Sequence, residues 1–138
     1  MKLSEARDCY YSFSGSASAT ARQIAFAGIA VVWVFNQPQA DHPIGLSSEL
    51  ALTLLLLCAS LAADLLQYTL STAIWGFYAR YKEKELRHRF HEDPNIEPPP
   101  SLNWPGIAMF WLKLFLLFSA YIVLARFLIQ ALAPSGET

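Results

Sequence analysis

Residues 50–77 read LALTLLLLCASLAADLLQYTLSTAIWGF, an apolar run with an aspartate, Asp64, at its middle. A helix needs about 20 mainly apolar residues to cross the hydrocarbon core of a bilayer, and this run exceeds that length. The chain of 138 residues is 54% hydrophobic and 14% aromatic, with a mean hydropathy of +0.31. This composition is more apolar than that of a soluble domain of similar size. The run and the composition together predict a membrane protein.

Two further segments, 17–35 and 107–133, have the length and apolar character of membrane spans. We therefore expect seven parts along the chain: an N-terminal cytoplasmic or interfacial segment (1–16), a first span (17–35), an outer loop (36–49), a second span with a cytoplasmic stalk (50–91), a Pro-rich linker (92–106), a third span (107–133) and an outer tail (134–138). Ser47 or Ser48 is the predicted N-cap of the second helix. The predicted fold class is all-α, with three spans and a long second helix that extends into the cytoplasm.

The distribution of lysine and arginine predicts the orientation of the spans. Basic residues lie before the first span and after the second, whereas the loop 36–49 and the tail 134–138 have none. Cytoplasmic loops carry the excess of Lys and Arg in membrane proteins. The N-terminus and the second loop are therefore predicted to be cytoplasmic, and the first loop and the C-terminus to lie outside.

The predicted stalk is basic and helical. It has no proline before Pro94, and Glu83 and Glu85 precede arginines at the four-residue spacing that favours helical ion pairs. The basic residues expected to contact lipid, a phosphate-bearing ligand or a protein partner are Arg80, Lys82, Lys84, Arg87 and Arg89. His88 and His91 are three apart, but their basic neighbours favour a solvated helix end over a metal site. We expect no bound metal.

The second span carries a narrow polar stripe. On a helical wheel its polar residues fall close to one line, a set that we call the polar seam: Thr53, Ser60, Asp64, Gln67 and Ser71. An ionised carboxylate at the centre of a spanning helix costs about 2.5 to 3.5 kcal/mol even on the most lenient insertion scale. The polar seam must therefore face protein or water.

Three interpretations of the polar seam are open. In the first, the polar seam holds helices together: Asp64 pairs with Arg126 of an antiparallel third helix, while Lys113 points elsewhere and reaches the membrane surface. In the second, the polar seam lines a water-filled path formed by several copies of the chain, and Asp64 sets a preference for cations. In the third, Asp64 is the proton or substrate site of a small transporter, although the chain has no inverted repeat or broken helix.

Motifs for catalysis are missing from the sequence. It has no glycine-rich phosphate loop, no GxSxG, no HExxH and no pair of acidic residues within a span. The net charge of −1 gives no reason to expect direct binding to nucleic acid. We predict that the protein is not an enzyme and needs no cofactor.

The segment FSGSASATARQIAFAGIAVVWVF, residues 13–35, resembles the opening of small multi-pass proteins encoded in bacterial anti-phage defence systems. In those systems a compact membrane effector is paired with a sensor that makes or senses a nucleotide signal. The resemblance covers the first span and the general layout. It implies an effector of the bacterial inner membrane that oligomerises and permeabilises the membrane when triggered, and it assigns no role to any single residue.

Our hypothesis is a homo-oligomeric inner-membrane effector, in anti-phage defence, that forms a gated ion-conducting or membrane-disrupting assembly. The polar seam lines its path, and the predicted ion pair between Asp64 and Arg126 holds the resting state. Membrane lipids, further copies of the chain and a cytoplasmic protein or nucleotide-type trigger are its expected partners. The alternative is a non-conducting membrane adaptor or anchor subunit that docks a soluble partner through the stalk, and a holin-like lysis protein is a third hypothesis.

Overall fold

The computed structural model of the protein describes residues 3–36, 45–85 and 97–133, and every regular element within these ranges is a helix. The elements in chain order are α1 (Leu3–Val34), α2 (Ser48–Glu85), the short 3-10 helix η1 (Pro100–Asn103) and α3 (Trp104–Leu132). Three of these helices contain stretches that are long and apolar enough to cross a membrane. The prediction of an all-α chain with three such helices is confirmed.

The ends of α2 and α3 follow from local residue chemistry. The Ser47 hydroxyl accepts a hydrogen bond from the backbone N–H of Leu50 at 3.3 Å, which confirms the predicted N-cap of α2. Pro105 lies in the first turn of α3, where its missing N–H costs no helical hydrogen bond. At the other end Ala133 is extended, as is usual for a residue that precedes a proline.

Helix α1 includes both the predicted N-terminal segment and the predicted first span. It runs without interruption from Leu3 to Val34. The stretch contains no proline, and its many alanines favour a helix enough to carry it through Gly15. The portion apolar enough to span a membrane begins at Gly15.

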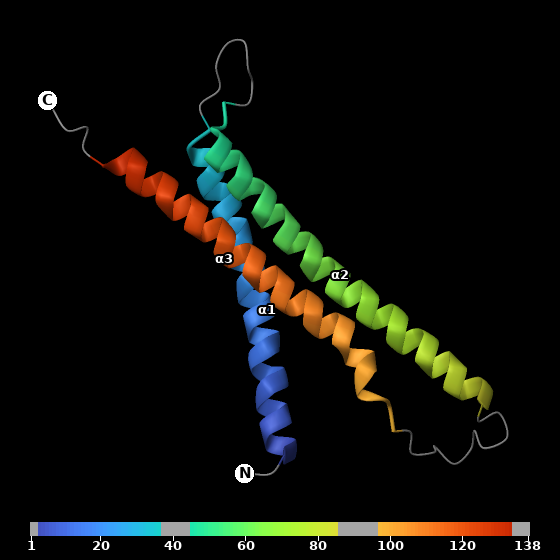
Figure 1. The fold of residues 1–138 in the computed structure, drawn as a ribbon. Coiled ribbons are helices and arrows are strands. Elements are labelled where there is room, and N and C mark those ends of the chain that lie inside the picture. Colours follow the sequence, from blue (N-terminus) through green and yellow to red (C-terminus); the bar gives the residue numbers. More distant parts are fainter. Residues whose placement is uncertain (1–2, 37–44, 86–96, 134–138) are drawn as a thin grey trace, which may run out of the picture.

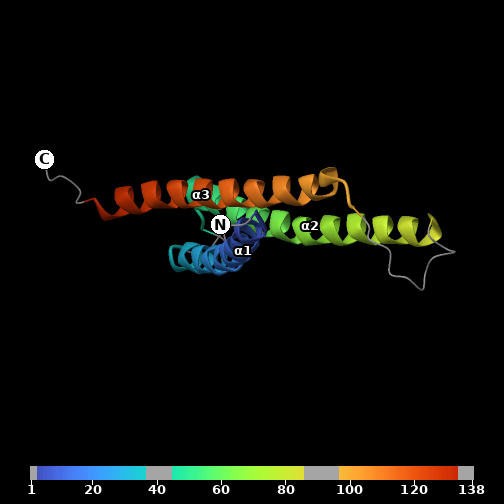
Figure 2. The ribbon, with the colours of Figure 1, turned by 90° about the horizontal axis from the view of Figure 1, so that it is seen from below.

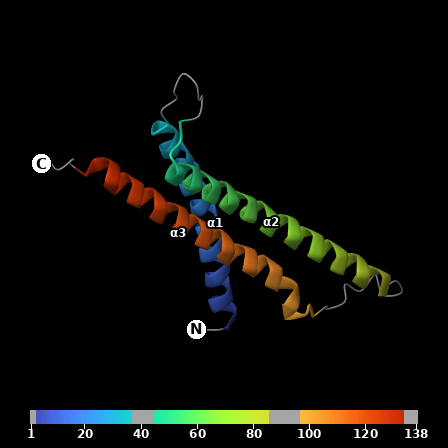
Figure 3. The same cartoon turned by 45° about the horizontal axis from the view of Figure 1, so that its top comes forward.

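Helices α2 and α3 pack side by side in opposite directions, and α1 crosses them obliquely (Figure 1; Figures 2 and 3 give two further views). Along the contact, positions on both helices advance in steps of seven residues. Ser71 lies against Gly106, Asp64 against Lys113, and Leu57 is clustered with Ala120. A seven-residue repeat of this kind marks coiled-coil-like packing, which is common among membrane helices.

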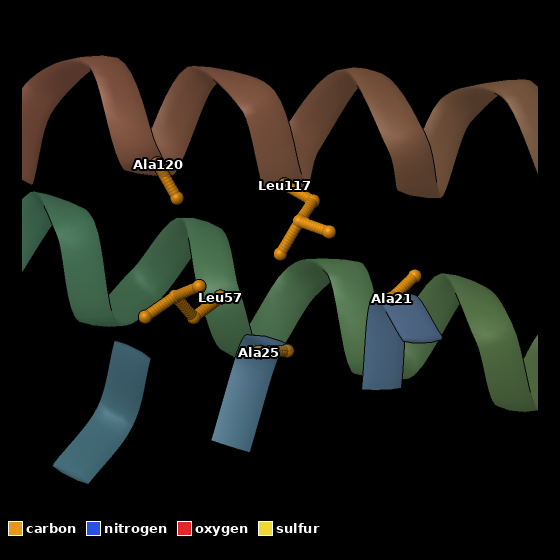
Figure 4. Close-up of a cluster of buried hydrophobic side chains, with 5 residues drawn as sticks. All are labelled: Ala21, Ala25, Leu57, Leu117 and Ala120. Atoms are coloured by element: carbon orange, nitrogen blue, oxygen red, sulfur yellow. The ribbon is translucent and has the colours of Figure 1, made fainter. Parts of the chain in front are cut away.

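Small residues allow α1 to approach the other two helices closely. Figure 4 shows the cluster at the crossing, in which Ala21 and Ala25 of α1 meet Leu57 of α2 and Leu117 and Ala120 of α3. One turn further along α1, a Cβ atom on Gly28 would lie 2.9 Å from Leu57 Cδ1 and 3.1 Å from the Tyr121 hydroxyl oxygen. The crossing of α1 therefore depends on the absence of side-chain bulk at this position.

The outer surface of the bundle is apolar on all three helices. Phe26 of α1, Leu65 of α2 and Phe115 of α3 are each more than 60% exposed, and many other large apolar side chains accompany them. Soluble monomers rarely expose apolar surface on this scale. The surface and the three long apolar helices together suggest a multi-pass membrane protein.

Candidate functional site

Asp64, a member of the polar seam on α2, is at the centre of a group of charged and polar side chains from all three long helices. Its Oδ1 accepts hydrogen bonds from the Lys113 ammonium of α3 and, at 3.0 Å, from the Ser18 hydroxyl of α1, while its Oδ2 lies 3.4 Å from Nε of Arg22, also on α1. The Lys113 ammonium also donates to the Ser18 hydroxyl oxygen. We call Ser18, Arg22, Asp64 and Lys113 the charge cluster.

Of the three charged members of the charge cluster, two are buried and one is partly exposed. Asp64 is 5% exposed and Lys113 only 1%, whereas the side chain of Arg22 is 44% exposed. Lysine is rarely buried so completely unless it is paired. The enclosed part of the charge cluster is therefore the Asp64–Lys113 ion pair, and Arg22 joins it from the surface.

Aromatic rings line the two cations. The Lys113 ammonium lies 5.2 Å from the centre of the Phe110 ring and 6.0 Å from that of Tyr68, and the Arg22 guanidinium carbon lies 5.7 Å from the Tyr68 ring centre. These separations permit cation–π attraction. The Tyr68 hydroxyl oxygen is also 3.4 Å from the Ser18 hydroxyl oxygen. Tyr68 thus lies close to Arg22 and Ser18 of α1 and to Lys113 of α3.

The charge cluster carries unequal numbers of positive and negative groups. One carboxylate, Asp64, faces two cations, Lys113 and Arg22. An uncompensated charge in an apolar environment is costly, so the excess positive charge is stable only where it reaches water, a headgroup or another anion. Arg22 is the member exposed enough to do so.

The remaining residues of the polar seam lie in the contact between helices. The Ser60 hydroxyl donates to the backbone carbonyl of Lys113 at 2.9 Å, and the buried Thr53 hydroxyl donates to the carbonyl of Glu49 within α2, also at 2.9 Å. Ser71 lies beside Gly106. The Gln67 side-chain oxygen is enclosed and accepts no hydrogen bond from the described part of the chain. In this single chain the polar seam therefore faces protein.

The structure does not bring Arg126 to Asp64. Arg126 is exposed on α3, and the cations at the Asp64 carboxylate are Lys113 and Arg22. A pair between Asp64 and Arg126 requires an alignment with Tyr121, and not Lys113, level with Asp64, which misaligns the two helices by eight residues, or about 12 Å at 1.5 Å per residue. That alignment matches the middles of the two predicted spans, but α2 continues far beyond the beginning of α3. Lys113, expected to reach the membrane surface, points into the bundle instead.

The first helix supplies two residues that sequence reasoning did not assign to the site, Ser18 and Arg22. A signal for Lys113 was available, because Gly106, Lys113 and Ala120 repeat every seven residues on α3, as Leu57, Asp64 and Ser71 do on α2. No comparable repeat identifies Ser18 or Arg22. Their place depends on the crossing of α1, which the sequence pattern does not define.

The described part of the predicted stalk is the end of α2, and its basic side chains are at least partly exposed. Lys82 donates to a Glu85 carboxylate oxygen at 2.7 Å, and this hydrogen bond raises the pKa of Lys82 above its ordinary value. Arg80 and Lys84 are exposed. Arg87, Arg89, His88 and His91 lie outside the described residues. Among residues 3–36, 45–85 and 97–133, no group of His, Cys, Asp or Glu is arranged to hold a metal ion.

Comparisons with known proteins return no matching family model, no similar curated protein and no similar solved structure. A functional argument for this chain therefore starts from its own residues.

The arrangement of the charge cluster permits two kinds of chemistry. When closed, it holds α1 against α2 and α3 through charge-assisted hydrogen bonds, which are stronger than neutral ones. Ser18 and Arg22 belong to α1, so separation of α1 would take both from Asp64 and leave only the ion pair with Lys113 of α3. The same contacts can therefore be a structural connection or a latch.

Proposed function

We propose that the protein is a multi-pass membrane effector of the bacterial inner membrane, with its N-terminus and the end of α2 in the cytoplasm. In this proposal several copies assemble into a gated ion-conducting or membrane-disrupting structure. The bundle described above is the resting state, and the charge cluster is the latch that keeps it closed. The resemblance to effectors of anti-phage defence supplies the physiological setting.

The observation that carries the proposal is the position of the charge cluster inside an apolar bundle. Apolar side chains of similar size would join three helices as well or better, because replacing a buried ion pair with well-packed apolar residues is often neutral or stabilising. Ionisable residues within membrane spans are expensive and commonly mark ion or proton pathways. The ion pair between Asp64 and Lys113 therefore favours a function over packing alone.

The contacts between helices indicate which helix moves on opening. Helices α2 and α3 contact each other along most of α3, whereas α1 meets them mainly at its crossing. The contacts that hold α1 include the charge cluster, the small-residue cluster of Figure 4 and a hydrogen bond of 2.6 Å from the Tyr121 hydroxyl to the Ile24 carbonyl. Near the end of α1, Val32 also packs in a buried cluster with Leu50 of α2 and Leu124 of α3. We infer that α1 leaves first, which exposes Asp64, and that the polar seam becomes accessible only in an assembly of several copies.

Ion flux into liposomes tests the proposal. Purified wild-type protein is compared with Arg22→Gln, which removes the cation through which α1 holds Asp64, and with Arg126→Gln, a matched loss of an exposed cation on α3. Flux that rises severalfold in Arg22→Gln and stays at the wild-type level in Arg126→Gln supports a latch. No flux from any variant, in protein shown to be folded and oligomeric, contradicts it.

A second function, the non-conducting adaptor, is favoured by a separate observation. The polar seam is closed within one chain, and α2 continues for several turns beyond the level of Gly106, ending in the exposed Arg80 and Lys84. This end of α2 is positioned to dock a soluble partner. Charge reversal at Arg80 and Lys84 should then abolish in-cell cross-linking to that partner, while Lys113→Met leaves the cross-link intact. The opposite pattern counts against the adaptor.

A further inference from the structure

The excess positive charge of the charge cluster is exposed at one residue, Arg22. Asp64 balances one of the two cations, and Lys113, at 1% exposure, cannot reach any group outside the bundle. Arg22 is 44% exposed on its side chain. If the charge cluster is to be neutral, a second anionic group must therefore contact Arg22.

We propose that Arg22 binds the phosphate of a membrane phospholipid at the surface of α1, beside Tyr68. This site rests on the membrane insertion of the proposed function but not on conduction. A guanidinium has five N–H donors, and in the described part of the chain Arg22 directs its Nε toward Asp64 at 3.4 Å. The two terminal nitrogens form a planar fork that matches the oxygens of a phosphate.

The depth of Arg22 suits a headgroup contact. Arg22 lies seven residues beyond Gly15, where the span of α1 begins, or about 10 Å at 1.5 Å per residue. Asp64 is likewise seven residues from Ser71, which lies against Gly106 near the beginning of α3. A long arginine side chain at such a depth extends to the interface, where phospholipid phosphates lie.

The neighbouring aromatic ring supports the same assignment. The Arg22 guanidinium carbon is 5.7 Å from the Tyr68 ring centre, and Tyr68 is 47% exposed on the same surface. Tyrosine is enriched at membrane interfaces because its ring is apolar and its hydroxyl is polar. Tyr68 thus holds the guanidinium between Asp64 on the inside and the phosphate on the outside.

Charge balance makes a specific prediction about Lys113. In the Lys113→Met variant one carboxylate faces one cation, so Arg22 pairs with Asp64 alone and the requirement for a phosphate disappears. The lipid contact should be lost although Lys113 itself is buried and touches no lipid. A purely nonspecific attraction of Arg22 to headgroups would not respond to this change.

Solid-state NMR in bilayers tests the site directly. The protein carries ¹⁵N in its arginine side chains, and the experiment measures dephasing of the guanidinium signals by ³¹P in phospholipid bilayers and phosphate-free buffer. The Arg22 signal is identified as the difference from Arg22→Lys. Lys84→Met, an exposed lysine of α2, is the matched control for Lys113→Met. Oriented circular dichroism confirms that the helices are inserted.

The expected result is ³¹P dephasing of the Arg22 signal in the wild type and in Lys84→Met, and its loss in Lys113→Met. A second sample, in bilayers of phosphate-free galactolipid with added inorganic phosphate, distinguishes a lipid phosphate from a soluble one. Dephasing in the galactolipid sample alone shows a site for soluble phosphate and overturns the lipid assignment. An inserted wild-type protein without dephasing in either bilayer also overturns it. Failure of the helices to insert refutes the proposed function first, and oriented circular dichroism reveals that case.

Discussion

Replacing Lys113 with methionine should destabilise the folded bundle strongly. Methionine matches much of the lysine volume but removes the ammonium group that contacts Asp64 and Ser18. Asp64, 5% exposed, then keeps the Ser18 hydroxyl at 3.0 Å and the Arg22 guanidinium at 3.4 Å. Breaking a buried ion pair by removing one partner costs about 3 to 5 kcal/mol. Because Arg22 remains as a partner, we expect the lower end, about 3 kcal/mol.

Much of this loss of folding stability should be recovered when the charge of Asp64 is also removed. In the double variant Asp64→Asn/Lys113→Met the buried carboxylate is gone, and the side-chain oxygen of the introduced asparagine can still accept from the Ser18 hydroxyl. We expect the double variant to recover at least half of the loss, because the cost lies in a buried carboxylate left with only the partly exposed Arg22, and not in lost packing. The free energy of unfolding is measured by helicity during reversible denaturation in mixed detergent micelles. Lys84→Met, which alters an exposed lysine, should stay within about 0.5 kcal/mol of the wild type.

Two results would refute this reasoning. One is a Lys113→Met variant as stable as Lys84→Met, which would show that the pair contributes nothing to the fold. The other is a double variant whose loss equals the sum of the two single losses, because additivity means that the two residues do not interact.

Further predictions concern three other contacts. Gly28→Ala should destabilise the bundle by about 1 to 3 kcal/mol, since its Cβ would lie 2.9 Å from a leucine side chain, whereas Gly76→Ala, which meets nothing within 4 Å, should be neutral or stabilising in the same micelle assay. Tyr121→Phe removes the hydroxyl that donates to a backbone carbonyl of α1 and should cost about 0.6 to 1.7 kcal/mol in that assay. Glu85→Gln should return the raised pKa of Lys82 toward its ordinary value, as followed by NMR titration. The stabilising effect of this contact is present at neutral pH and is lost as the pH rises through the folded-state pKa; an unchanged titration curve would contradict it.

Much of the fold is readable from the sequence because its main signals are local. Hydrophobic length predicts the three long helices, and a serine before an apolar run predicts the N-cap of α2. The inference that the polar seam must face protein or water also depends only on the cost of polar groups in lipid. Ser60 and Asp64 are indeed buried against other helices.

The partner of Asp64 was mispredicted because it depends on how two helices are aligned. Helical periodicity shows which residues share a face of α2 or α3, but it does not determine how far one helix is shifted along the axis of the other. The alignment is set by close packing, in which Gly106 admits the Ser71 hydroxyl and Ala120 meets Leu57. A shift of one heptad would preserve the periodicity and change every cross-helix pair. The seven-residue repeat therefore points to the face of α3 that carries Lys113, and the three-dimensional packing selects Lys113 on that face.

The most direct test of the central claim is to lock α1 onto α2 and measure flux. Ala25→Cys and Leu57→Cys place thiols in the buried cluster where the two helices meet, in an Arg22→Gln protein from which Cys9 and Cys58 have been removed. Loss of free thiols reports formation of the disulfide. If movement of α1 opens the path, oxidation should suppress ion flux into liposomes and a reductant should restore it. Equal flux from the oxidised and reduced proteins would contradict the claim that the charge cluster is a latch on α1.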